Sequence, residues 1–125
     1  MTNYGLVAEM HGKFRIETPP EPQSLDTAVM VGRVEMMLEE LVELMRAHRA
    51  GDLAEEADAL VDLVVFALGT AHLMGLPWDD VFAEVMRANL AKERGVGKRR
   101  NGLDLVKPEG WTPPDVAGVL RRAAR

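Results

Sequence analysis

The stretch EELVELMRAHRAGDLAEEADALVDLVVFAL, residues 39–68, decides the fold of this chain. Gly51 and Asp52 divide it, and Asp52 is a good N-cap for the helix that follows. Before the break, apolar residues recur at steps of three and four, as on one face of a helix; they are Val31, Val34, Leu38, Leu41 and Met45. We therefore expect helices over residues 27–50 and 53–74, and the very short turn between them makes them antiparallel neighbours.

The flanking segments also favour helices. Residues 3–10 are expected to form one or two helical turns, and the proline-rich run at 18–22 cannot continue a helix because proline lacks the amide donor. A further helix is expected over residues 78–93, then an extended segment, and last a short helix capped by Asp115. No β-hairpin signal outweighs these patterns. The sequence predicts an all-α protein, an antiparallel helical bundle in one domain over residues 1–125.

The composition limits the functional classes. With 125 residues, 47% hydrophobic and 28% charged, the chain can build a core and is not of disordered composition. It contains no cysteine, which excludes disulfides and thiolate metal sites. No apolar run approaches the roughly 20 residues that a membrane helix needs. We expect a cytoplasmic protein with no membrane association.

The middle of the second helix predicts self-association. Residues 60–68 are apolar almost all round the helix, which indicates burial on several sides. A chain of 13.8 kDa cannot cover such a helix by itself. We therefore expect a homo-oligomer, either a dimer or a tetramer, with part of this surface at the subunit interface.

Charge is divided unevenly along the chain. Acidic residues dominate residues 35–62, and basic residues dominate residues 87–107. A small phosphorylated ligand bridged by a metal ion suits both regions. Nucleic-acid binding is not expected, because the basic tail from residue 87 onward has a single aromatic residue, Trp111, and a strongly acidic neighbour.

Four carboxylates are expected to meet inside the helical hairpin. Glu40 and Glu43 are three residues apart and share a helix face, and Asp58 and Asp62 are four apart on the next helix. Counting from the turn places Glu43 level with Asp58, and Glu40 level with about residues 61–62. Like charges held this close repel, and a divalent cation relieves the repulsion. An all-oxygen acidic site predicts Mg²⁺, with Mn²⁺ as an alternative.

The alternative for these acids is an ordinary solvated helix surface. Glu35 and Glu56 are assigned to such a surface. For the other four acids, Glu40, Glu43, Asp58 and Asp62, the sequence supports a metal site and a solvated surface about equally. Glu39 and Glu55 are intermediate, either as ligands at the edge of the site or as acids that hold the ligands in place.

The chain resembles the MazG-like and phosphoribosyl-ATP pyrophosphatase superfamily of all-α nucleoside triphosphate pyrophosphatases. Its signature is E-x-x-E on one helix and E-x-x-D on the next. The resemblance rests on four segments and covers about residues 30–115; the segments are residues 56–63, 66–71, 87–92 and 107–114. It implies a four-helix MazG-like core.

The second acidic pair departs from the signature. Glu55 and Asp58 match E-x-x-D literally, but Asp62 also resembles its aspartate, and the residue three positions earlier is Ala59. Either Glu55 and Asp58 or Asp58 and Asp62 form the second pair. The pairing counted from the turn favours Asp58 and Asp62.

The resemblance implies nucleotide contacts in the basic region. Lys92 would neutralise phosphate and Asn89 would bond sugar or phosphate. Lys107 and Trp111 lie in a proline-bracketed segment that can fold over the site, with Trp111 stacking on a base; the alternative is that Trp111 only pins the tail to the body. Arg33, two turns before Glu40, can reach a phosphate or form a surface ion pair.

The implied reaction converts a nucleoside or deoxynucleoside triphosphate and water to the monophosphate and diphosphate. Metal held by the carboxylates would neutralise the phosphates and activate water. Glu39 or Glu40 would act as the general base. The alternative is a helical interaction module, or a nucleotide-sequestering module, with the same fold and no turnover.

Overall fold

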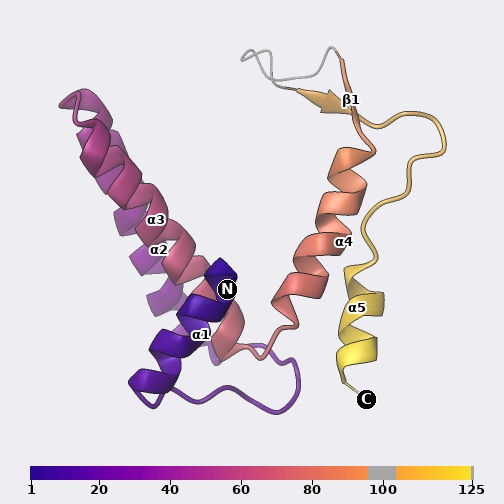
Figure 1. Ribbon diagram of the computed structural model, residues 1–125, viewed down its shortest axis with the longest axis horizontal. Coiled ribbons are helices and arrows are strands. Elements are labelled where there is room, and N and C mark those ends of the chain that lie inside the picture. Colours follow the sequence, from indigo (N-terminus) through magenta and orange to yellow (C-terminus); the bar gives the residue numbers. More distant parts are fainter. Residues whose placement is uncertain (96–103, 125) are drawn as a thin grey trace. The chain divides into compact units, whose positions relative to one another are not determined.

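The computed structural model describes residues 1–95 and 104–124 of the protein (Figure 1). Helices make up most of it, so the predicted all-α class is confirmed. The elements in the described residues are α1 (Asn3–Lys13), α2 (Thr27–Arg49), α3 (Leu53–Leu73), α4 (Trp78–Leu90), β1 (Glu93–Arg94), β2 (Leu105–Val106) and α5 (Val116–Ala123).

The chain divides into two compact units, Met1–Trp78 and Asp79–Arg125. The single domain and the four-helix core stay predictions. Within the described parts of the chain, no single helix is both long and apolar enough to cross a membrane.

In the first unit, α2 and α3 form the predicted antiparallel hairpin (Figure 1). Gly51 has a positive φ of 66°, which suits the tight turn between them. Asp52 caps α3 as predicted, because its Oδ1 accepts a hydrogen bond from the Glu55 amide at 3.1 Å. Near the turn the buried residues are Ala47 and Ala59. The side chains that the two helices bury near the turn are therefore small.

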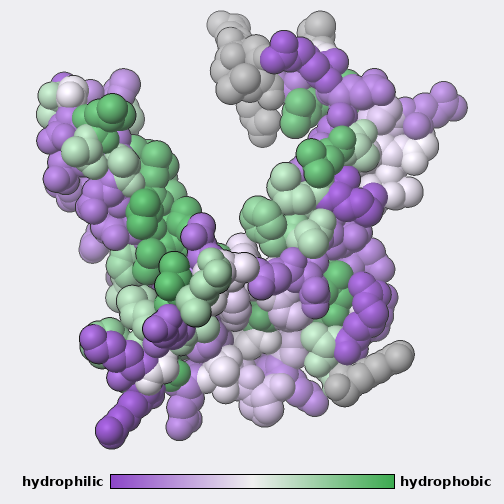
Figure 2. All heavy atoms as spheres, viewed as in Figure 1, coloured by the Kyte–Doolittle hydropathy of each residue, from purple (hydrophilic) through white to green (hydrophobic). Residues whose placement is uncertain are grey.

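The apolar stripe of α2 is not covered within the chain. Its five residues, Val31, Val34, Leu38, Leu41 and Met45, are 43–54% exposed. On α3, Leu60, Val61 and Val64 are exposed while Leu68 is buried. Figure 2 shows the hydrophobic side chains gathered along the hairpin. Among the described residues no large side chain is fully buried, so a single copy has a thin core.

The N-terminal helix α1 is longer than predicted. The expectation was one or two turns over residues 3–10, but α1 runs on to Lys13. The Thr2 side chain accepts a hydrogen bond from the Gly5 amide at 2.9 Å and caps the helix. Val7 and His11 are buried, and α1 packs on α3. Packing thus stabilises a helix that its periodicity indicates only weakly.

The proline-rich segment after α1 crosses the end of α3. The Thr18 hydroxyl donates a hydrogen bond to the His72 carbonyl oxygen at 2.6 Å. Gly75, with a φ of 65°, allows a close approach, since a Cβ at this position would lie 3.0 Å from the Pro19 carbonyl oxygen. The segment is therefore not helical, as its prolines predict, and it is fastened to the end of α3.

The second unit departs from the prediction after residue 90. The helix expected over residues 78–93 ends at Leu90, and Glu93–Arg94 pairs with Leu105–Val106 as a short antiparallel ladder. Gly95 allows this pairing, because a Cβ there would lie 2.7 Å from a methyl carbon of Val106. Two-residue strands have no readable periodicity, so the sequence could not reveal them.

The last helix, α5, begins as predicted. Asp115 accepts a hydrogen bond from the Gly118 amide at 3.0 Å and caps the helix. Val119 is buried. The C-terminal segment is thus an ordered part of the second unit.

Candidate active site

A groove between α2 and α3 gathers the predicted acids. It has a volume of about 820 Å³ and lies near the hairpin turn. We call it the acidic groove because seven carboxylates line it, namely Glu39, Glu40, Glu43, Asp52, Glu55, Asp58 and Asp62. Apart from Asp52, the N-cap of α3, these are the residues that the sequence assigned to catalysis or metal binding, and none of that set is missing. Glu35 and Glu56, assigned to the solvated surface, do not line it.

The helix spacing explains this convergence. Glu40 and Glu43 lie one turn apart on α2, and Asp58 and Asp62 lie one turn apart on α3. The short connection at residues 50–52 sets the two helices in antiparallel register. Two turns of each helix therefore bring their acids to one groove.

The electrostatics of Glu40 show that the carboxylates affect one another. Removal from solvent raises the pKa of the Glu40 carboxyl, and the charges of Asp62, Glu43, Asp58 and Glu39 raise it further, in that order. Asp62 thus has the largest charge effect on Glu40. This agrees with the register counted from the turn, which placed Glu40 level with residues 61–62.

The same observation bears on the second acidic pair. Asp58 and Asp62 both raise the pKa of Glu40, and Glu55 is not among the groups that do so. Glu55 lines the groove closer to the turn, where its amide bonds the Asp52 cap. The geometry therefore supports Asp58 and Asp62 as the pair opposite Glu40.

The donor set of the groove suits a hard divalent cation. It offers carboxylate oxygens only, the ligands that Mg²⁺ prefers, and the repulsion on Glu40 is of the kind that a cation relieves. Within residues 1–95 and 104–124, however, no three acidic or histidine side chains already form a metal-binding group. Glu43 also lies 3.5 Å from Arg46 in an exposed ion pair. The metal site therefore stays a prediction, supported by donor chemistry.

Arg33 bonds across the hairpin to α3. Its Nε donates to Thr70 Oγ1 and its Nη2 to the Phe66 carbonyl oxygen, both at 3.0 Å, and within the described residues it forms no ion pair. Its guanidinium carbon lies 5.5 Å from the centre of the Phe66 ring, and burial lowers the pKa of Arg33. Arg33 thus joins α2 to α3, and its contact with phosphate stays a prediction.

Three of the predicted nucleotide contacts meet in the second unit. Lys107 Nζ lies 4.9 Å and Lys92 Nζ 5.6 Å from the centre of the Trp111 ring. The indole Nε1 of Trp111 donates to the Ala88 carbonyl oxygen at 2.7 Å. Trp111 therefore pins the C-terminal segment to α4, as the alternative held, and two cations contact its ring.

Asn89 lies near this cluster along the chain. It is half-buried on α4, and its carbonyl oxygen accepts a hydrogen bond from the Lys92 amide at 3.1 Å. Lys92 itself follows the end of the helix. Because the helix ends at Leu90, the shared helical face expected for Asn89 and Lys92 is replaced by a turn.

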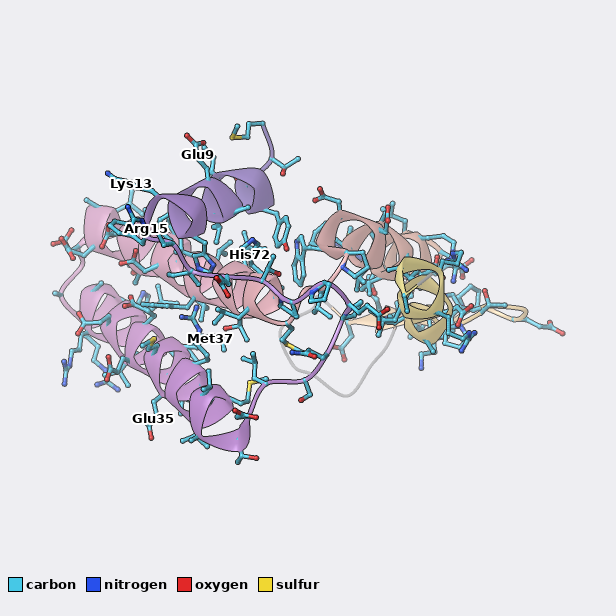
Figure 3. All side chains as sticks on the ribbon, turned by 90° about the horizontal axis from the view of Figure 1, so that it is seen from below. Glu9, Lys13, Arg15, Glu35, Met37 and His72 are labelled. Atoms are coloured by element: carbon cyan, nitrogen blue, oxygen red, sulfur yellow. The ribbon has the colours of Figure 1, made fainter. Side chains whose placement is uncertain are left out.

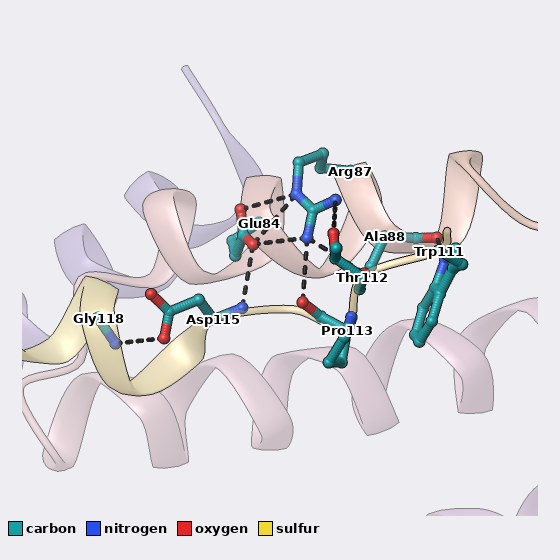
Figure 4. A network of polar contacts seen from close by, with 8 residues as sticks. All are labelled: Glu84, Arg87, Ala88, Trp111, Thr112, Pro113, Asp115 and Gly118. Carbon is teal, nitrogen blue, oxygen red and sulfur yellow. Dashed lines mark hydrogen bonds and ion pairs between the residues drawn. The ribbon is translucent and has the colours of Figure 1, made fainter. Parts of the chain in front are cut away.

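A polar network that the sequence did not reveal holds the same segment (Figure 4). Arg87 Nη2 donates to Glu84 Oε1 at 2.9 Å and to the Pro113 carbonyl oxygen at 3.1 Å. Glu84 Oε1 also accepts from the Asp115 amide at 3.0 Å. These hydrogen bonds and the charge of Arg87 lower the pKa of Glu84. The spacing of Glu84 and Arg87 predicts a helix pair, but not the contacts made 25 or more residues away.

Comparison with known proteins decides the family. The family model for phosphoribosyl-ATP pyrophosphohydrolase matches residues 7–89, about two thirds of the chain. The chain belongs to this family. The match spans α1 to α4 and includes the acidic groove, but it ends before Lys92, Lys107 and Trp111. A search of curated proteins finds no match.

Membership confirms the MazG-like all-α superfamily to which the resemblance pointed. It also indicates the general chemistry, which is that of a pyrophosphohydrolase acting on a nucleotide.

Proposed function

We propose that this pyrophosphohydrolase cleaves a nucleoside or deoxynucleoside triphosphate to the monophosphate and diphosphate in the presence of Mg²⁺, with Mn²⁺ as an alternative. One observation carries the proposal: all six carboxylates predicted from the sequence line one groove, in a chain of a nucleotide pyrophosphohydrolase family. A triphosphate is an anion and cannot enter such a groove without cations. A divalent metal ion is a cation that oxygen ligands of the acids and of the phosphates can bind together.

Four of the carboxylates are the proposed ligands. Glu40 and Glu43 on α2 and Asp58 and Asp62 on α3 would hold the ion, with Glu55 at the edge of the site. A bound divalent cation would supply neutralisation of the phosphate charge and activation of water for attack at the α-phosphorus. Glu40 and Asp62 are half-buried, whereas Glu43 and Asp58 are exposed.

A proton acceptor is also available in the groove. Glu39 is exposed and precedes Glu40 on α2. When Glu40 holds the cation, Glu39 is the carboxylate of the two that is free to accept a proton from the attacking water. We therefore assign Glu39 as the general base and Glu40 as a ligand.

The counter-charge for the phosphates would come from Lys92 and Lys107. Both ammonium groups lie at the Trp111 ring, so this cluster combines positive charge with an aromatic face. That combination suits a nucleotide. Asn89 would bond the sugar or a phosphate. Arg33 would contact phosphate through its Nη1, since its bonds to α3 use Nε and Nη2.

We also propose that the protein is a homo-dimer or homo-tetramer. A single copy exposes the apolar stripe of α2 together with Leu60, Val61 and Val64 of α3, and it buries no large side chain completely. Apolar surface of this extent on a small helical chain favours an interface between copies.

A substrate screen tests the proposed reaction. The purified chain is incubated with each common ribo- and deoxyribonucleoside triphosphate and with phosphoribosyl-ATP, for which the family is named, and pyrophosphate is measured with Mg²⁺, with Mn²⁺ and with EDTA. We expect pyrophosphate from at least one triphosphate, with metal only. Nucleotide binding without pyrophosphate would favour the sequestering module, and neither binding nor release would favour the interaction module. Release from phosphoribosyl-ATP alone would replace the proposed substrate class.

A further inference from the structure

A histidine pair holds α1 on α3. His11 of α1 is only 3% exposed, and its Nδ1 lies 2.8 Å from Nδ1 of His72. The ring centres are 4.7 Å apart, with the ring planes at 76°. For this hydrogen bond, one Nδ1 carries the hydrogen and the other offers its lone pair. Two neutral imidazoles satisfy the contact completely.

The surroundings oppose a positive charge on the pair. Arg33 of α2 and His11 both approach the backbone of Gly69: a Cβ there would lie 2.7 Å from Arg33 Nη2 and 3.2 Å from His11 Nε2. On α1 itself, Glu9 points away from α3 (Figure 3). In the part of the chain that the structure describes, His11 has no carboxylate within ion-pair distance.

These surroundings disfavour the protonated form of His11. Burial lowers the pKa of His11, and the charges of His72 and Arg33 lower it further. A lowered histidine pKa means that the docked state binds fewer protons than the undocked state. Docking is therefore fully stable above the ordinary value of 6.5 and weakens as the pH falls through the range between 6.5 and the lowered value.

We propose that the contact between His11 and His72 is a proton-sensitive latch, which holds α1 on the hairpin while both imidazoles are neutral and releases α1 when the pair gains a proton. This inference does not rest on the proposed reaction, because neither histidine lines the acidic groove.

The latch controls access to an apolar surface. An apolar groove of about 430 Å³ lies between α1 and α3, and Leu6 and Met10 line it from α1. From α3 it is lined by Leu60, Val61, Val64, Val65 and Leu68. Leu60, Val61 and Val64 are already exposed, so release of α1 would extend this apolar face to the buried Leu68. Acidification would thus change which hydrophobic surface the hairpin presents.

Amide hydrogen exchange followed between pH 7.5 and 5.0 tests the latch on the intact chain. Protection of the α1 amides should fall roughly 10-fold per pH unit below 6.5 for each proton taken up, while amides in the middle of α2 keep their protection. In parallel, NMR of the imidazole rings reports when His11 is protonated. Unchanged α1 protection after His11 has been protonated would overturn the proposal.

Two variants separate the latch from other acid effects. His11→Leu combined with His72→Leu replaces both partners by apolar groups, so the protection of α1 should become independent of pH over this range. His48→Gln is the matched control. His48 is an exposed histidine of α2 that lies 2.9 Å from Glu56, and its loss should leave the wild-type response of α1 intact.

If the double variant does not fold, the hydrogen-exchange measurement on the wild type tests the proposal by itself. If the double variant folds and its α1 still opens on acidification as in the wild type, the histidine pair is not the latch. The same conclusion follows if His48→Gln abolishes the response.

Discussion

Arg33 of α2 donates to the hydroxyl oxygen of Thr70 on α3 at 3.0 Å, across the hairpin. The Thr70 hydroxyl in turn donates to the Phe66 carbonyl oxygen at 2.7 Å, which also accepts from Arg33. This three-residue contact lies two turns before Glu40 on α2. It therefore joins the two helices at the end of the hairpin opposite the turn.

Loss of the Thr70 hydroxyl should destabilise the hairpin. Thr70→Val keeps the shape of the side chain but leaves Arg33 Nε, a partly buried donor, without its acceptor. We expect the free energy of unfolding to fall by about 1–3 kcal/mol, measured by denaturant titration. Thr27→Val, at an exposed position at the start of α2, serves as the control and should change stability little. Equal stability of the wild type and Thr70→Val would mean that the contact contributes nothing.

Loss of the Lys92 ammonium should impair nucleotide turnover. Lys92→Ala removes one of the two cations at the Trp111 ring, and kcat/KM should fall by an amount equivalent to about 1–3 kcal/mol. Steady-state kinetics on the substrate found in the screen would measure this. Lys13→Ala, which removes a lysine 5.5 Å from the Phe14 ring in the first unit, is the matched control. Normal turnover by Lys92→Ala, together with weaker and strongly salt-dependent binding of DNA or RNA, would assign the basic region to nucleic acid instead.

A charge on the exposed face of α3 should dissociate the oligomer. Val61 is 60% exposed and lies in the apolar region of residues 60–68, so Val61→Arg would place a charge inside the proposed interface. Sedimentation at low micromolar concentration should show a dimer or tetramer for the wild type and smaller species for Val61→Arg. Leu90→Arg alters a leucine of α4 that is 79% exposed, and it should leave assembly intact. A folded 13.8 kDa monomer in the wild type would contradict the proposal.

Acid should weaken the second unit through Glu84. Hydrogen bonds to Arg87 and to the Asp115 amide lower its pKa, so the unfolded state binds the proton more readily. The stabilisation is therefore present above the ordinary value of 4.5 and is lost as the pH falls through the lowered value. The α5 amides should be better protected from hydrogen exchange in the wild type than in Glu84→Gln. This difference in protection should become smaller as the pH falls through this range.

The control for this prediction is Glu109→Gln, since Glu109 is an exposed carboxylate of the same unit. It should match the wild type at every pH. A constant difference between wild type and Glu84→Gln from pH 7 to pH 3 would show that the ionised carboxylate does not stabilise the segment.

The hairpin and its acids were predictable from local signals. Three- and four-residue spacing identifies α2 and α3, the pair Gly51-Asp52 identifies the turn, and counting from that turn brings Glu40 close to Asp62. Each step uses residues separated by a few helical turns at most. The family match then indicates the chemistry, while the metal, the triphosphate and the oligomer remain proposals.

The contacts that local patterns do not encode were missed. His11 and His72 are 61 residues apart, and Arg33 and Thr70 are 37 apart, so only packing brings them together. The helix α1 is short and depends on burial against α3, and β1 and β2 are too short for any periodicity. Trp111 shows the same limit, since its spacing does not reveal that the indole bonds the Ala88 carbonyl oxygen.

Pyrophosphate release by two neutralised variants and one control tests most directly whether the acidic groove is the active site. Glu43→Gln and Asp58→Asn each remove a proposed metal ligand, whereas Glu35→Gln neutralises an α2 carboxylate outside the groove. Melting without metal, followed by circular dichroism, checks that each variant is folded. We expect the two groove variants to melt at or above the wild-type temperature, because a like charge has been removed.

With Mg²⁺ and the substrate found in the screen, Glu43→Gln and Asp58→Asn should lose turnover by about 100-fold or more, while Glu35→Gln keeps it. Wild-type rates of pyrophosphate release from both groove variants would contradict the assignment of the site. So would an equal loss of activity in Glu35→Gln.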